Sequence, residues 1–174
     1  MGKRYLGGAL LMAALPLLCQ APHNRRVQEL LRFTLNENPE QVMGLLGRPQ
    51  RIDDSMAGYQ SWQYEFSADE QNDDNSPPAW FVCMNTAKQQ ILSVTRNFDN
   101  PQDVGDVFPT SQTAVYYWPS KDAPNYSVRL RALPGDVLLL AMGTAKPGER
   151  TTQLILIRRS ALKTFMPWLA EQLR

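Results

Sequence analysis

Residues 38–49 read NPEQVMGLLGRP and carry both a start and a stop signal for a short helix. Asn38 is a residue type that caps helix N-termini, Pro39 suits the first helical position, and Gln41 stands where a capping box needs it. Gly47 favours the backbone conformation that closes a helix, and Pro49 prevents its continuation. The stretch therefore predicts a helix of about two turns.

A second helix is predicted just before it, over residues 25–36. Val27, Leu30, Leu31 and Leu35 recur there at the spacing of one helical face. Two short helices are thus expected at the N-terminal end of the folded part of the chain.

Period-two alternation after these helices predicts strands. Trp62, Tyr64 and Phe66 alternate with polar residues, and residues 79–85 and 90–98 follow at hairpin spacing. Residues 100–110 are expected to be an irregular connection. Further strands are expected over 114–118, 127–133, 137–142 and 151–157, before a C-terminal helix that Pro167 should kink or split.

The expected fold class is α+β. Two short N-terminal helices pack on an antiparallel sheet, and further antiparallel strands and a C-terminal helix follow. The sequence leaves open whether the two groups of strands share one sheet or form two layers.

The first 21 residues are typical of a secretory signal peptide. Lys3 and Arg4 precede an uncharged run over residues 5–19, which as a helix spans about 22 Å against a bilayer core of about 30 Å. Cleavage after Ala21, lipidation at Cys19 and retention as a membrane anchor all stay open. We expect an exported chain, periplasmic or associated with the outer membrane, with residues 22–174 forming one domain.

Charge and cysteine content narrow the function classes. The 18 basic residues fall to 16 without Lys3 and Arg4, against 17 acidic ones, so the mature chain has a net charge of −1. A near-neutral domain lacks the general attraction to phosphates on which nucleic-acid binding depends, so no nucleic acid is expected as a partner. Cys83 is left without an intrachain disulfide partner once Cys19 is removed.

No catalytic, cofactor-binding or metal-binding residue is predicted, and no cofactor is expected. Cys83 lies in an apolar run and is expected to be buried, while the chain's one histidine, His23, lies close to the signal segment. A nucleophilic cysteine needs a general base near it. The four acids of residues 69–74 lack the spacing of a calcium loop.

Two charged pairs are the predicted partner-binding residues. Asp73 and Asp74 belong to the acidic loop over 67–78, and Arg129 and Arg131 point to one face of a strand. The aromatic side chains of the predicted strands are expected to pack in the core; they are Trp62, Tyr64, Phe66 and Trp80. If they were exposed, they would instead be natural interface anchors.

The helix stop and the strand aromatics resemble a known family. Glu40-Gln41-Val42, then Leu46-Gly47-Arg48-Pro49, then Trp62 and Tyr64, with a hairpin over Phe81–Val94, resemble the BamE/SmpA-like (SmpA/OmlA) outer-membrane assembly lipoproteins and the related β-lactamase-inhibitor-protein-like fold. The resemblance covers residues 26–98, and the β-rich half over 113–174 has no counterpart. It implies a non-catalytic protein-binding domain of the cell envelope.

The sequence thus predicts an exported binding or assembly module whose partner is another envelope protein. Two alternatives stay open. One is an inhibitor or immunity-type protein acting on an envelope enzyme, and the other is a carboxylate-dependent hydrolase.

Overall fold

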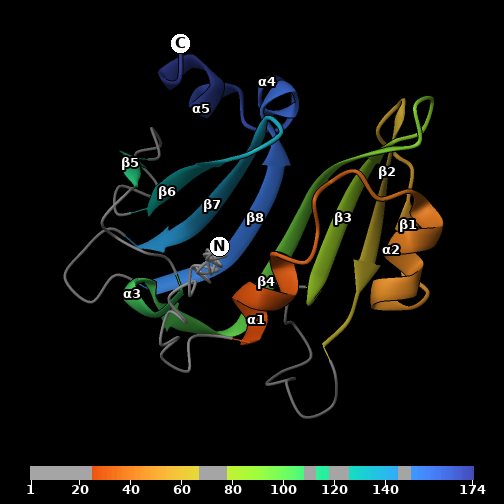
Figure 1. The fold of residues 1–174 in the computed structure, drawn as a ribbon, viewed down its shortest axis with the longest axis horizontal. Coiled ribbons are helices and arrows are strands. Elements are labelled where there is room, and N and C mark those ends of the chain that lie inside the picture. The colour runs from red at the N-terminus through yellow and green to blue at the C-terminus, as the bar shows by residue number, and fades with distance from the viewer. Residues whose placement is uncertain (1–24, 67–77, 108–112, 118–125, 145–149) are drawn as a thin grey trace, which may run out of the picture.

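The computed structural model describes residues 25–66, 78–107, 113–117, 126–144 and 150–174. Within these ranges the chain forms one eight-stranded antiparallel sheet (Figure 1), in the order β1-β2-β3-β4-β8-β7-β6-β5. Its strands are β1 (Arg51–Asp53), β2 (Tyr59–Tyr64), β3 (Trp80–Asn85), β4 (Gln90–Asp103), β5 (Ala114–Tyr117), β6 (Tyr126–Leu133), β7 (Val137–Thr144) and β8 (Arg150–Arg158).

The sheet consists of two four-stranded meanders, β1 to β4 and β5 to β8, which meet where β4 pairs with β8. Val94 of β4 lies opposite Leu156 of β8 at this junction. The question that the sequence left open is therefore answered: both groups of strands share one sheet.

The connection expected to be irregular is largely regular. Strand β4 continues to Asp103 and leads directly into a short helix, α3 (Val104–Val107). Its register against β8 shifts between Asn97 and Gln102, so the strand bends there and goes on pairing. The prolines and polar residues of this stretch gave no strand pattern in the sequence. The strand forms because it pairs with β8, which comes about 50 residues later in the chain.

Helix α2 (Pro39–Leu46) confirms the prediction from residues 38–49. The Gln41 amide donates to the Asn38 side chain and the Asn38 amide donates to the Gln41 side chain, each at 2.9 Å. Gly47 has a φ of 83°, a region that residues with a side chain rarely adopt, and its amide closes the helix on the Met43 carbonyl.

Helix α1 (Arg25–Leu30) is shorter than its apolar spacing predicts. The chain leaves the helix after Leu30, so Leu31 is exposed while Phe33 and Leu35 are buried. Leu35 takes a positive φ of 63°, which directs the chain back toward α2.

The C-terminal helix is split, as Pro167 predicts. A 3-10 turn, η2 (Arg159–Ala161), leads into α4 (Leu162–Phe165), and α5 (Pro167–Gln172) follows. Met166 between them has φ −138° and ψ 62°, outside the helical region that proline disfavours for the residue before it.

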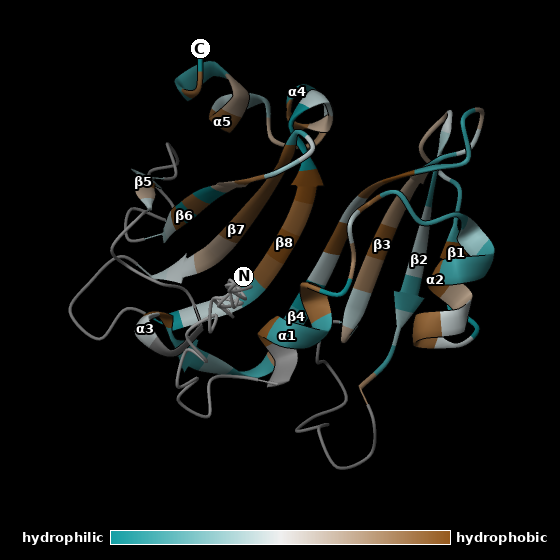
Figure 2. Ribbon diagram, viewed as in Figure 1, coloured by the Kyte–Doolittle hydropathy of each residue, from teal (hydrophilic) through white to brown (hydrophobic). Residues whose placement is uncertain are grey.

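The core lies on both faces of the sheet. Leu139 and Leu156 face one side together with α1 and α2, whereas Leu140 and Ile157 face the other side together with α4 and α5. Figure 2 shows the hydrophobic colour concentrated along β7 and β8, the strands buried on both sides.

The expected fold class, an α+β fold with two N-terminal helices packed on a sheet, is wrong. The frame of the protein is one continuous antiparallel sheet, and the N-terminal helices, of six and eight residues, are too short to form a layer over it. The apolar spacing predicted longer helices than the structure contains. Residues in irregular segments, such as Phe33, also fill the core and produce apolar positions that resemble a helical face. Among the described residues, no helix is long and apolar enough to cross a membrane.

Candidate functional site

A cavity of about 310 Å³ opens where α1, α2, β2 and β3 meet; we call it the aromatic pocket. Its buried members are Phe33, Tyr64 and Ala79, and its exposed members include Leu45 on α2. The remaining lining residues are Leu46, Trp80, Glu29, Arg32, Gln50 and Glu65. The pocket thus combines aromatic and aliphatic walls with charged and amide side chains, and its volume is near the lower end of the ~300–1,000 Å³ usual for ligand pockets.

The alternation of β2 places the pocket's central side chain. Trp62 and Tyr64 lie on the sheet face that carries α1 and α2, whereas Tyr59 packs on the opposite face. Tyr64 is directly opposite Trp80 of β3, and the Phe33 ring lies 5.9 Å from the Trp80 ring. Three aromatic rings from separate parts of the chain therefore line one cavity.

The Tyr64 hydroxyl is buried beside this pocket and is not accessible from its open space. The side chain is only 3% exposed, and its buried oxygen has no hydrogen-bond partner among the described residues. A buried polar group left unpaired costs about 1–3 kcal/mol. Burial also raises the pKa of Tyr64 to about 12, so the hydroxyl keeps its proton at physiological pH.

The buried side chain of Arg96 places a positive charge beside the pocket. Arg96 is 2% exposed, and its guanidinium lies 5.1 Å from the Trp80 ring centre and 5.3 Å from that of Phe66. It also donates to the carbonyls of Ala79 and Asn97 at 3.3 and 3.1 Å. One wall residue of the pocket, Trp80, is thus already in contact with a cation.

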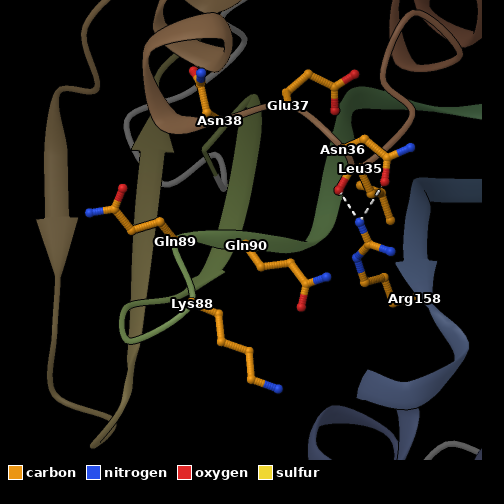
Figure 3. Close-up of a pocket in the computed structure, with 8 residues that line it drawn as sticks. All are labelled: Leu35, Asn36, Glu37, Asn38, Lys88, Gln89, Gln90 and Arg158. Atoms are coloured by element: carbon orange, nitrogen blue, oxygen red, sulfur yellow. Dashed lines mark hydrogen bonds between the residues drawn. The ribbon is translucent and has the colours of Figure 1, made fainter.

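A second cavity, of about 420 Å³, lies at the other side of the 31–38 segment and is lined mainly by polar side chains (Figure 3). The Arg158 guanidinium donates to the Leu35 carbonyl, to Asn36 Oδ1 at 2.9 Å and to the Ile91 carbonyl at 3.0 Å. Arg158 therefore connects β8, β4 and the segment before α2, and it donates to two backbone carbonyls and the Asn36 side chain. Lys88, Gln89, Gln90, Glu37 and Asn38 complete the lining.

The predicted partner-binding arginines lie in neither cavity. Arg129 and Arg131 are half-buried on β6, opposite Ala141 and Leu139 of β7, in the meander that does not form the aromatic pocket. Asp73 and Asp74 lie outside the described residues, as does the acidic loop on which the inhibitor alternative depends.

Two residues of the aromatic pocket, Tyr64 and Trp80, were predicted from the sequence, but as core residues and not as the lining of a cavity. Trp62 and Phe66 are indeed buried. Tyr64 is buried as well, yet it borders the cavity with the half-buried Trp80. Phe33, predicted to lie within a helix, had no signal that would place it against β3.

Cys83 is buried, as predicted, at 4% exposure. Burial raises the pKa of its thiol to about 11, which keeps it protonated and unreactive at neutral pH. Across the ranges that the structure describes, no group of three or more His, Cys, Asp or Glu side chains is placed to hold a metal ion.

Comparison with known proteins gives a partial likeness in fold. Neither a protein-family model nor a curated protein matches the chain. A cysteine-rich secretory protein from Staphylococcus aureus superposes with a TM-score of 0.43 at 11% identity, over 75% of this chain and 45% of that one. An extracellular protein containing an SCP domain, from Bacillus anthracis, gives a TM-score of 0.45 at 15% identity, over 72% of this chain and 44% of that one.

The predicted resemblance to BamE/SmpA-like lipoproteins is wrong. No family model supports it, and the similar solved structures are secretory and SCP-domain proteins. Residues 26–98 also do not form a separate unit, because β4 pairs with β8 in one sheet. This chain spans less than half the length of either structure. Both are described as secretory or extracellular proteins.

Proposed function

We propose that this protein is an exported binding module without catalytic activity, which holds another cell-envelope protein through the aromatic pocket. The observation that carries the proposal is the pocket itself: a cavity open to the surface, where the aromatic side chains of Phe33, Tyr64 and Trp80 lie beside the exposed Leu45 and a rim of charged and polar side chains. The finer location, in the periplasm or at the outer membrane, is part of this proposal and rests on the signal-like residues 1–21.

The surroundings of the pocket favour a protein partner. Leu45 at the pocket is 40% exposed, and Ile52 of β1 is 53% exposed. Ile52 is opposite Trp62, so it lies on the same face of the sheet as Tyr64. Exposed apolar side chains around a concave site are typical of interfaces that bury about 800 Å² per partner around a few anchor residues.

Site-specific photo-crosslinking tests this proposal. A photoreactive amino acid replaces Leu45 beside the pocket or, as the control, Tyr117 on the distant edge strand β5, which is 60% exposed. Both variants are expressed in native cells and irradiated, and crosslinked residues are identified by mass spectrometry.

We expect one envelope protein, joined through a defined segment, at position 45 and not at 117. An excess of wild-type protein should suppress that crosslink, whereas an excess of a Trp80→Ala variant should not. Equal crosslinking at both positions, or equal competition by both proteins, would contradict the proposal.

A further inference from the structure

The second cavity, of about 420 Å³, differs from the aromatic pocket in its polar lining, and we call it the polar cavity. We propose that it binds the free C-terminal end of a peptide, through the terminal carboxylate and the amides that precede it. The polar cavity is separate from the aromatic pocket, so this inference goes beyond the proposed function and does not depend on it.

Two cations line the polar cavity without a carboxylate partner. The Arg158 guanidinium donates to two backbone carbonyls and to the Asn36 side chain, all of which are uncharged. Lys88 is exposed, and in the part of the chain that the structure describes its side chain has no hydrogen bond or ion pair. Neither positive charge is neutralised by a bonded carboxylate there, so together they attract an anion.

The carboxylate of the lining is engaged elsewhere. Glu37 Oε1 accepts hydrogen bonds from the backbone amide and the hydroxyl of Thr34, at 2.8 and 2.9 Å. In Figure 3 the Glu37 side chain points away from Lys88. Two positive charges against one negative charge leave the lining with a formal net charge of +1. This balance suits a singly charged carboxylate better than a phosphate dianion.

Amide side chains surround the two cations. Each amide offers both a donor and an acceptor, which matches the N–H and C=O groups of a peptide backbone. Gln90 is half-buried, and in Figure 3 its side chain lies between those of Lys88 and Arg158. The other amides of the lining are Asn36, Asn38 and Gln89. The polar cavity therefore offers cations for a terminal carboxylate and amides for the residues before it, a recurring mode of peptide recognition.

Two strained backbone positions border the polar cavity. Of the three described residues other than glycine with a positive φ, Leu35 at 63° and Gln89 at 47° both line it. Such conformations persist only where their surroundings hold them, and they concentrate at active sites and ligand clamps. Arg158 fixes the wall formed by the 31–38 segment to β8 and β4, so this side of the site is formed before a ligand arrives.

The experiment is an NMR titration of the isotope-labelled full chain with N-acetyl-alanyl-alanine, its C-terminal amide, acetate and inorganic phosphate. We expect N-acetyl-alanyl-alanine to cause saturable shifts of the Lys88 and Gln90 amide signals. Its C-terminal amide should bind at least about 10-fold more weakly, because hydrogen bonds to a charged group are lost. Acetate lacks the peptide amides and phosphate carries the wrong charge, so both should also bind more weakly.

Replacement of Lys88 by glutamine separates the carboxylate contact from the rest of the site. Lys88→Gln should bind N-acetyl-alanyl-alanine about 3- to 10-fold more weakly and discriminate less between the acid and its amide. Lys88 is exposed, so this change should leave the fold intact. Lys163→Gln is the matched control, because Lys163 is an exposed lysine on α4, on the opposite face of the sheet. It should bind as the wild type does.

Several outcomes would overturn the inference. They are equal affinities for the acid and its amide, an equal loss in the two lysine variants, binding of acetate or phosphate as tight as that of the dipeptide, and no binding at all. Dipeptide-induced shifts confined to Leu45 and Leu46 would place the ligand in the aromatic pocket and would also overturn it. The crosslink at position 45 tests the proposed function separately, so either idea can fail while the other stands.

Discussion

Replacement of Arg158 by methionine tests how the segment before α2 is held to the sheet. Methionine keeps an apolar stem but removes the guanidinium, and with it the hydrogen bonds to the Leu35 carbonyl, the Ile91 carbonyl and the Asn36 side chain. Leu35 and Ile91 are fully buried, so water does not readily replace the lost donors at their carbonyls.

The expected loss follows from these contacts. Hydrogen bonds to a charged group contribute about 1.5–3 kcal/mol each, and a partly exposed guanidinium lies at the low end of that range. We therefore expect Arg158→Met to lower the free energy of unfolding by about 2–4 kcal/mol. Leu35 adds to the effect, because its positive φ of 63° is strained for a residue with a side chain and needs contacts to hold it.

Urea unfolding followed by tryptophan fluorescence measures this loss. The neighbouring Arg159→Met is the matched control: its ion pair with Asp136 spans 3.5 Å between side chains that are 52% and 59% exposed. Exposed pairs contribute about 0–1 kcal/mol. If the two variants unfold at the same urea concentration, Arg158 does not hold the segment and the reasoning fails.

Three further predictions use the same unfolding measurement. Gly143→Ala should prevent correct folding or destabilise the protein strongly, because an added Cβ would lie 1.9 Å from the Arg150 carbonyl oxygen; a soluble variant with wild-type stability would contradict the backbone approach at this bulge. Asn38→Ala should cost about 0.5–2 kcal/mol through loss of the capping box, and an unchanged midpoint would show that the cap seen here contributes nothing. The free energy of unfolding should fall as the pH rises above about 9, because burial raises the folded-state pKa of Cys83 from 9.0 to about 11 and the fold prefers the protonated thiol. The free energy of unfolding of Cys83→Ala should fall less steeply over pH 9–11. Parallel curves for the variant and the wild type would refute this assignment.

Local features of this protein follow from its sequence because their causes are local. The capping box of Asn38 and Gln41 closes within four residues, and Gly47 ends the helix that they begin. The break before Pro167 likewise comes from adjacent residues. Alternation along β2 placed Trp62 and Tyr64 on a common face, which is the face that the structure buries.

The tertiary structure alone decided how these elements combine. The single sheet depends on β4 pairing with β8, a contact between strands far apart in sequence that no local pattern encodes. Helix α1 ends at Leu30, short of its apolar periodicity. Further along, Arg158 from the last strand donates a hydrogen bond to the Leu35 carbonyl.

The same holds for the aromatic pocket. The sequence predicted Tyr64 to be a core residue, but only chain folding brings Phe33 and Trp80 together beside it. Its buried hydroxyl has no hydrogen-bond partner in the part of the chain that the structure describes. Sequence periodicity tells which face of an element is apolar, since that depends on neighbours a few residues away. Which faces meet, and what cavity they leave, depends on long-range packing that only the folded chain specifies.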